Sequence, residues 1–158
     1  MKITDGKLPG VKLICPDIHE DFRGSYVMTY NAREYAELNF APVENCISIS
    51  SKGVLRGIHV DPECNKLIYV THGRIYYVVV DLATGEYENH ILSGGNHVQI
   101  FKPKQYGAGF LALTDDVVFC YMQDRYYDPS RQKTFAWDRF PNIWWPTKNP
   151  ILSERDDL

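Results

Sequence analysis

One stretch of the chain stands out for the chemistry that its side chains could perform. Residues 50–59 combine Lys52, Arg56 and His59 with two glycines, and Lys66 follows at a distance. Histidine is the side chain that titrates near neutral pH, and arginine and lysine bind anionic oxygens. Each of these residues taken alone is more often structural or solvated than functional, so their meaning depends on the rest of the chain.

Three motifs that often decide a protein's function are missing. The chain has no glycine-rich phosphate loop, no Gly-x-Ser-x-Gly nucleophile motif and no His-x-His pair. Its histidines are isolated from one another in the sequence: His19, His59, His72, His90 and His97. Nothing in this spacing proposes a metal site, and we expect neither a metal nor a cofactor.

Length and composition narrow the class of protein. The 158 residues suit one domain with one core, and 44% of them are hydrophobic. A net charge of −3 supplies no global basic field for nucleic acid or an anionic membrane. The four cysteines form no Cys-x-x-Cys pair, and neither a secretory signal nor a membrane-spanning apolar run is present. We expect a single cytoplasmic domain over residues 1–158, without nucleic-acid or membrane partners.

Most of the chain predicts β-strands separated by short turns. Residues 66–72 and 74–81 are apolar, strand-like runs that flank Gly73. Turn signals recur every 8–14 residues or so, roughly the spacing of an antiparallel sandwich or closed barrel. The only good helix candidate covers residues 32–38, with Asn31 as its cap. The C-terminal stretch is too rich in Trp and Pro to be a solvated tail, so we expect it to pack across the barrel.

Several short motifs lie in a fixed order along almost the whole chain. They are Asp21-Phe22-Arg23-Gly24, the run 50–59 with Lys66, Val79-Val80-Asp81-Leu82, Tyr121 with Tyr126-Tyr127, Ala136-Trp137-Asp138, Trp145-Pro146 and residues 150–156. Their ordered combination resembles the dTDP-4-dehydrorhamnose 3,5-epimerase family and its relatives that act on other nucleotide-linked 4-keto sugars. The resemblance implies an all-β, antiparallel jelly-roll (cupin-like) barrel that forms a homodimer and serves deoxysugar or cell-surface polysaccharide biosynthesis.

The resemblance also implies a reaction on a nucleoside-diphosphate-linked 4-keto sugar. A proton next to the ketone is removed, and the enolate is reprotonated from the opposite face, which needs a base, an acid and a cation but no metal or redox cofactor. His59 matches the family's general base, Tyr121 its acid and Lys66 the lysine at the enolate oxygen. Asp156 matches the carboxylate that hydrogen-bonds the base, and the neighbouring Asp157 leaves that register open.

Four further residues match substrate-binding positions. Arg23 and Arg56 match positions that bind the diphosphate, whose oxygens suit the planar guanidinium fork. Asn45 and Tyr127 are weaker matches for sugar or nucleotide contacts. Residues 145–153 also resemble relatives that act on GDP-linked heptoses, so the nucleotide, dTDP or GDP, stays open.

The chain departs from the family's pattern at three positions. Ala108 stands where a histidine is usual, Glu44 where a glutamine is usual, and Met28 where a glutamate is usual. We expect all three to line the pocket, and Ala108 and Met28 to make one side of it more apolar. From this we predict that C3 is inverted in preference to C5.

Two other functions remain open at this level. One is a keto-sugar isomerase of the same fold, and the other is a sugar-nucleotide or carbohydrate-binding module without catalysis. Retention of His59, Lys66 and Tyr121 together speaks against the second, because binding alone needs only arginines and aromatic residues.

Overall fold

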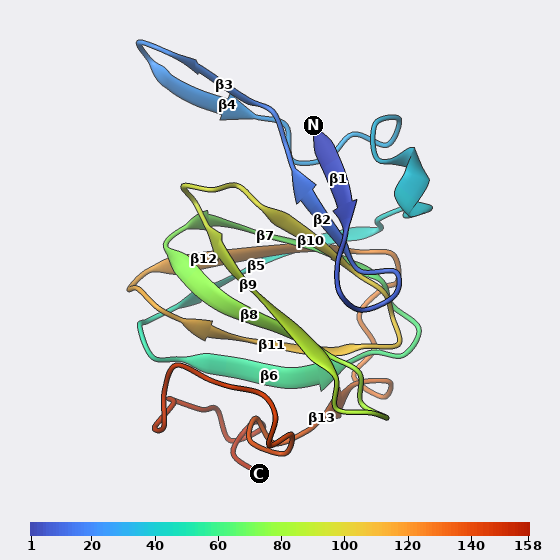
Figure 1. Cartoon of the computed structure of the whole chain (residues 1–158), viewed down its shortest axis with the longest axis vertical. Helices are drawn as coiled ribbons and strands as arrows, with labels where there is room; N and C mark the ends of the chain where they lie inside the picture. Colours follow the sequence, from blue (N-terminus) through green and yellow to red (C-terminus); the bar gives the residue numbers. More distant parts are fainter.

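Two antiparallel sheets face each other in the computed structural model, which describes residues 1–158 (Figure 1). The six-stranded sheet has the order β1 (Lys2–Asp5), β2 (Lys12–Cys15), β10 (Gln99–Lys102), β7 (Lys66–His72), β12 (Val117–Gln123) and β5 (Glu44–Ser50). The five-stranded sheet has the order β13 (Lys133–Thr134), β6 (Leu55–Val60), β11 (Gly107–Ala112), β8 (Arg74–Val80) and β9 (Tyr87–Ser93). This arrangement confirms the predicted all-β, antiparallel fold.

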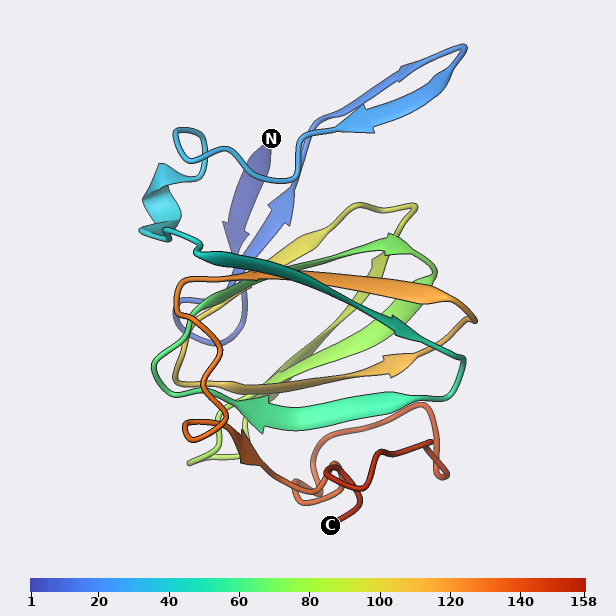
Figure 2. The ribbon, with the colours of Figure 1, turned by 180° about the vertical axis from the view of Figure 1, so that it is seen from behind.

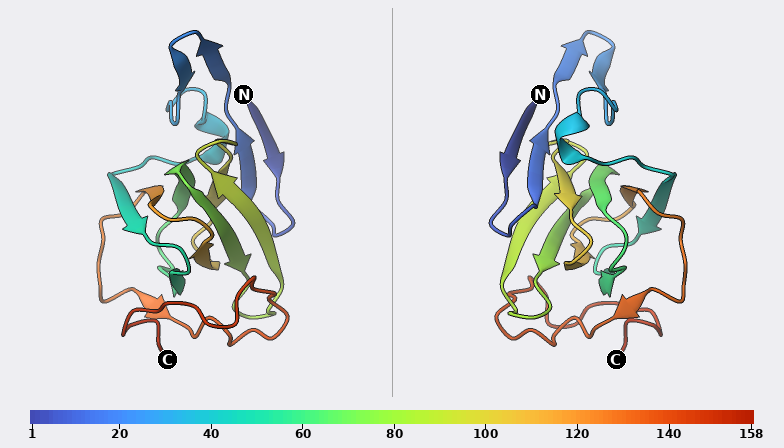
Figure 3. Two further views of the ribbon diagram at one scale, coloured as in Figure 1. Left: turned by 90° about the vertical axis from the view of Figure 1, so that its left-hand side faces the viewer. Right: turned by 90° about the vertical axis from the view of Figure 1, so that its right-hand side faces the viewer.

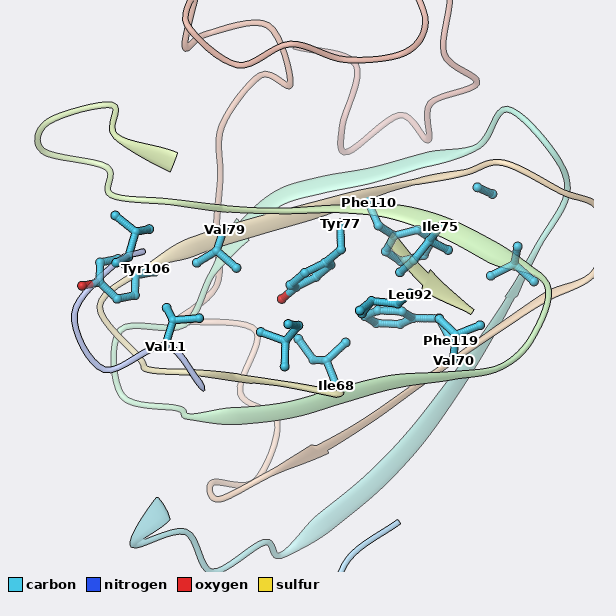
Figure 4. Close-up of a cluster of buried hydrophobic side chains, with 14 residues drawn as sticks. Val11, Ile68, Val70, Ile75, Tyr77, Val79, Leu92, Tyr106, Phe110 and Phe119 are labelled. Carbon is cyan, nitrogen blue, oxygen red and sulfur yellow. The ribbon is translucent and has the colours of Figure 1, made fainter. Parts of the chain in front are cut away.

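The space between the sheets holds a cluster of 14 buried side chains. On β8, Ile75, Tyr77 and Val79 point into this space, where they meet Phe110 and Phe119 from β11 and β12 (Figure 4). Phe110 and Phe119 stack with their ring centroids 4.4 Å apart. Aromatic and β-branched side chains fill a space between pleated sheets well, which explains the high aromatic content of the chain.

The outer face of the five-stranded sheet is covered by the C-terminal segment. Phe140, Ile143 and Trp145 are buried against the outward-facing residues of β8, and the Tyr76 hydroxyl donates to the Trp144 carbonyl at 2.7 Å. Both faces of β8 are therefore buried, which explains why its sequence is a continuous apolar run without alternating polar residues. The prediction that this segment packs across the barrel is confirmed.

The outer face of the six-stranded sheet is covered by residues 30–40, which follow strand β4 (Gly24–Val27). Tyr35, Leu38 and Phe40 are buried there against side chains of β2, β7, β10 and β12. The predicted helix over residues 32–38 is only partly correct, because regular helix is limited to the 3₁₀ turn η1 (Ala36–Leu38). The Asn31 side chain accepts the N–H groups of Arg33 and Glu34, which precede η1, and the left-handed Asn39 ends η1 after one turn.

A two-stranded hairpin, β3 (Ile18–Asp21) and β4 (Gly24–Val27), projects away from both sheets (Figure 2). The hairpin and the C-terminal segment lie on opposite sides of the barrel (Figure 3). No helix of the structure is long and apolar enough to cross a membrane.

Gly73 carries the chain from one sheet to the other. It is the single residue between β7 and β8, which belong to different sheets. Its φ is +79°, and a Cβ atom there would lie 2.7 Å from the Thr114 hydroxyl oxygen and 2.9 Å from Val117. A side chain would therefore be both strained and sterically blocked, so glycine is required at this tight connection.

A bulge in β6 decides which of its side chains face the space between the sheets. His59 lies opposite Ala108 and Arg56 lies opposite Phe110, so three steps along β6 match two steps along β11. Arg56 and His59 consequently share the inner face, although strict alternation would place them on opposite faces. Gly57 forms the bulge with a φ of +125°.

We predict that Gly57→Ala disrupts this bulge. The new Cβ would lie 2.6 Å from the Gly109 Cα, and the φ is one that side-chain-bearing residues rarely adopt. The strain and the overpacking together should lower the free energy of unfolding by about 2–4 kcal/mol, measured by urea unfolding. Gly95→Ala is the matched control, because its Cβ would make only an ordinary contact at 3.7 Å. Equal stability of the two variants would contradict this account of β6.

Candidate active site

A pocket of about 240 Å³ opens between the two sheets. The five-stranded sheet and its flanking segments contribute Arg56, His59, Asp61, Tyr77, Ala108, Gly109, Phe110, Gln132 and Arg155. The six-stranded sheet and the segment after it contribute Ser48, Lys66, Ile68, Lys102, Phe119, Tyr121, Gln123 and Tyr127. All four candidate catalytic side chains lie at this pocket or in direct contact with a residue that lines it.

His59 and Asp156 form a hydrogen-bonded pair at the wall made by β6. Nε2 of His59 lies 2.5 Å from Oδ1 of Asp156, and the other carboxylate oxygen accepts the Gly57 N–H at 3.3 Å. Asp156 is only 3% exposed, whereas Asp157 is exposed. The register that the sequence left open is thereby decided in favour of Asp156.

The C-terminal segment is held in place by strand-like hydrogen bonds before it reaches Asp156. The Leu55 N–H donates to the Ile151 carbonyl at 3.0 Å, and the Ile151 N–H donates to the Gly53 carbonyl at 2.9 Å. A turn then closes through the Asp156 N–H and the Ser153 carbonyl at 3.0 Å. These backbone hydrogen bonds hold the segment that leads to Asp156 against β6, and so place its carboxylate at the bulge.

The charge state of Asp156 follows from two opposing effects. Burial by itself would raise the pKa of its carboxyl group. The hydrogen bond and charge of His59, together with the Gly57 N–H, outweigh burial and hold the pKa below its ordinary value of 3.8. Asp156 is therefore ionised near neutral pH and orients the His59 ring, whose Nδ1 atom is left free to act as a base.

Lys66 and Tyr121 approach the pocket from the sheet opposite His59. The Lys66 ammonium lies 5.1 Å from the centroid of the Tyr121 ring. Burial lowers the pKa of Lys66, and burial also raises the pKa of Tyr121 to about 12, with a further contribution from the Cys46 thiol beside it. Tyr121 therefore keeps its proton near neutral pH, and base and acid candidates face each other across the pocket.

Two of the four predicted substrate-binding residues line the pocket. The Arg56 guanidinium donates to the Ser50 hydroxyl at 3.0 Å, which fixes its direction. Tyr127 lies at the pocket, and its backbone N–H donates to the Glu44 carboxylate at 3.1 Å.

The other two predicted binding residues lie outside the pocket of their own chain. Arg23 sits at the turn of the projecting hairpin, where it is ion-paired with Asp21 and 76% exposed. Asn45 lies on the outer face of β5, because Ser48 points into the pocket and side chains alternate along a strand, and it meets Tyr69 there. The inward neighbour of Asn45 is Cys46.

The three departures from the family's pattern have different locations. Ala108 lines the pocket directly opposite His59, as expected. Glu44 does not line the pocket, contrary to expectation, although it shares the inner face of β5 with Ser48; its carboxylate accepts a hydrogen bond at 2.6 Å from Gln123, which does line the pocket. Met28 does not line the pocket of its own chain, so that expectation was wrong. It lies at the base of the hairpin beside His19 and Tyr26.

Several pocket residues were not predicted from the sequence. Asp61 is buried and held by Arg131 at 3.1 Å and by Gln132 at 3.0 Å. Its position could have been found, because it is two residues after His59 and so faces the same side of the strand. For Lys102 and Arg155, no motif or spacing in the sequence indicated a place in the pocket. No group of three or more His, Cys, Asp or Glu side chains is arranged to hold a metal ion.

Comparison with known proteins points to one family. The family model described as dTDP-4-dehydrorhamnose 3,5-epimerase matches residues 5–158. The dTDP-4-dehydrorhamnose 3,5-epimerase of Shigella flexneri is 30% identical over 99% of this chain and 93% of its own length. A dTDP-4-dehydrorhamnose 3-epimerase from Streptomyces niveus is 31% identical over 99% of this chain and 81% of its own length.

A solved structure extends the similarity to the whole fold. The 3,5-epimerase of Legionella pneumophila, crystallised with dTDP-4-keto-L-rhamnose, superposes with a TM-score of 0.91 at 32% identity. The match covers 98% of this chain and 89% of the Legionella chain.

We predict that Asp156→Asn destabilises the protein in a pH-dependent way. A carboxyl group whose pKa is depressed by folding contributes stability above its ordinary pKa of 3.8, and the contribution is lost as the pH falls through the folded-state value. The variant should unfold about 1–3 kcal/mol more easily at pH 7, with a difference that shrinks below pH 3.8. Urea unfolding at both pH values measures this, with exposed Asp157→Asn as control. A difference that is independent of pH would contradict the conclusion that Asp156 is ionised in the folded protein.

Proposed function

The chain belongs to the dTDP-4-dehydrorhamnose 3,5-epimerase family and is an isomerase of nucleotide-linked 4-keto sugars, and from this premise we propose that it acts on a dTDP-linked 4-keto-6-deoxyhexose. The observation that carries the proposal is the His59–Asp156 pair on one sheet, facing Lys66 and Tyr121 on the other. A module that only bound sugars would need no such base and acid on opposite sides of one pocket, so we prefer catalysis to that alternative.

The proposed reaction begins with proton abstraction by His59. Because Nε2 is engaged by Asp156, the free Nδ1 takes the proton from the carbon next to the ketone. The electron pair moves onto the C4 oxygen, and the Lys66 ammonium stabilises the resulting enolate. Tyr121 then returns a proton to the carbon from the opposite face, and proton exchange with solvent restores both side chains.

The nucleotide is proposed to bind through its diphosphate near Arg56 and Arg155. Arg56 is held by Ser50, and the Arg155 Nε donates to the Thr134 hydroxyl at 3.0 Å. Guanidinium groups fixed in this way match phosphate oxygens at little further entropic cost. We favour dTDP over GDP because the relatives named above act on, or bind, dTDP sugars.

We further propose that the chain works as a homodimer in which each hairpin completes the partner's site. The hairpin carries Arg23 away from its own pocket and exposes the Phe22 side chain almost fully, at 98%. The outer face of edge strand β5 exposes Ile47 and Ile49 at 62% each. Exposed apolar groups of this kind favour association, and four free cysteines support a cytoplasmic location.

Inversion at C3 is proposed to be faster than inversion at C5. Ala108 lies beside His59 on the neighbouring strand and offers no hydrogen-bond donor, and a substrate oxygen left unpaired there costs about 1–3 kcal/mol. One of the two curated relatives named above is a 3-epimerase. Met28 no longer supports this proposal, because it lies away from the pocket of its own chain.

Solvent exchange tests the function. In deuterated water, the wild-type protein should incorporate deuterium into a dTDP-linked 4-keto-6-deoxyhexose, at C3 faster than at C5, as followed by NMR. His59→Asn should reduce this exchange by about 10²–10⁴-fold with little change in nucleotide affinity. Absence of exchange in the wild-type protein with any nucleotide-linked 4-keto sugar would refute the function, and equal rates at both carbons would refute only the preference for C3.

Mixed dimers test the role of Arg23. Arg23→Ala and His59→Asn should each be nearly inactive alone. If Arg23 acts across the interface, a hybrid dimer has one doubly defective site and one intact site, so random co-assembly should restore about a quarter of wild-type activity. If Arg23 acts within its own chain, every subunit has one defect and no activity returns. Arg33→Ala, an exposed arginine outside the hairpin, serves as control.

A further inference from the structure

A row of polar side chains crosses the inner face of the six-stranded sheet at one end. Lys102 on β10 lies directly opposite Lys66 on β7, and Lys66 lies opposite Gln123 on β12. Gln123 in turn lies opposite Glu44 on β5. Lys66, Lys102 and Gln123 all line the pocket, so this row forms one of its walls.

The two lysines at the end of this row have no carboxylate partner. No Asp or Glu oxygen lies within ion-pair distance of either ammonium group, and Lys66 makes no hydrogen bond within the protein. Lys102 is only 3% exposed, and it donates to the Tyr106 carbonyl at 2.8 Å and the Pro103 carbonyl at 3.2 Å. An ammonium group has three donors, so one N–H of Lys102 is left without a protein acceptor.

Placing two cations on directly opposite positions of neighbouring strands is unfavourable without an anion. Like charges in this arrangement repel, and burial strengthens the repulsion. The only acidic side chain that lines the pocket is Asp61, which Arg131 and Gln132 already occupy. The protein alone therefore leaves the positive charge of this wall uncompensated.

A second buried donor lines the same pocket without a partner. The Tyr77 hydroxyl is completely enclosed between the sheets and makes no hydrogen bond (Figure 4). A buried hydroxyl without a partner costs free energy that a bound polar group would recover. The pocket is thus arranged to receive oxygen atoms at more than the one position that Lys66 serves.

We propose that Lys102 is a second cationic group of the active site, which acts with Lys66 on the oxygen that becomes negatively charged in the reaction. The inference rests on the proposed function, because only a 4-keto sugar supplies an enolate oxygen there. The loss of a donor at Ala108 and the presence of a lysine elsewhere on the same pocket fit this assignment.

The energetic advantage of a lysine pair lies in the difference between ground and transition states. Burial, and then the neighbouring Lys66, lower the pKa of Lys102 to about 7, against weaker opposite effects of Cys64, Asp61 and Asp124. Repulsion between the lysines is present before the reaction and is relieved once the enolate forms between them. An interaction that is stronger in the transition state than in the ground state accelerates the chemical step.

Two variants of Lys102 separate its charge from its hydrogen bonds. Lys102→Met removes both, whereas Lys102→Gln keeps an N–H donor for the Pro103 and Tyr106 carbonyls but removes the charge. Both should lower kcat by about 10- to 100-fold with a much smaller change in KM. Lys104→Met, an exposed lysine two residues further along the chain, is the matched control and should resemble wild type.

The pH dependence distinguishes charge from structure. The ratio of wild-type to Lys102→Gln kcat/KM should be largest near pH 6 and should decrease by pH 8.5, since Lys102 loses its proton as the pH rises through about 7. Full activity in Lys102→Gln, or a ratio that is constant with pH, would overturn the inference and leave a structural lysine. If the proposed function itself is wrong, the wild-type protein shows no turnover. If only the inference about Lys102 is wrong, the wild-type protein is active and Lys102→Gln resembles it or differs from it equally at all pH values.

Discussion

The bulge in β6 is the constraint on which the site depends. Gly57 adopts a conformation that other residues avoid, and its Cα packs against Gly109 of the neighbouring strand with no room for a side chain. The extra residue changes the alternation of the strand, so Arg56 and His59 both face the pocket. The same Gly57 N–H donates to Asp156, so one backbone irregularity aims the histidine and anchors the carboxylate that orients it.

The two covered outer faces make a polar interior possible. The C-terminal segment buries apolar side chains on one sheet, and the segment around η1 buries them on the other. Each such aromatic or aliphatic side chain contributes about 1.5–3 kcal/mol when fully buried. Beside the apolar cluster, the space between the sheets also holds lysines, an arginine and a histidine, whose burial costs free energy. The packing on the two outer faces offsets that cost.

The division of labour between the two sheets also explains the chemistry. The five-stranded sheet carries the proposed base, His59, and the C-terminal segment beside it carries Asp156, whereas the six-stranded sheet carries Tyr121 and the two pocket lysines. A sugar held between the two sheets would have the proposed base on one side and the proposed acid on the other. Epimerisation requires that arrangement, and two rigid sheets hold it more accurately than loops would.

Local patterns in the sequence were enough to predict the family, the antiparallel β fold and the candidate catalytic residues. These follow from local patterns: alternation and turn residues for the strands, and the motifs around His59, Lys66, Tyr121 and Asp156 for the site. The choice of Asp156 over Asp157 and the outward direction of Asn45 needed the tertiary structure. The proposed role of Lys102 needed it as well, because each of these three conclusions depends on which strand lies opposite or on a one-residue change of register. A register is a relation between segments far apart in the chain, so no local pattern contains it.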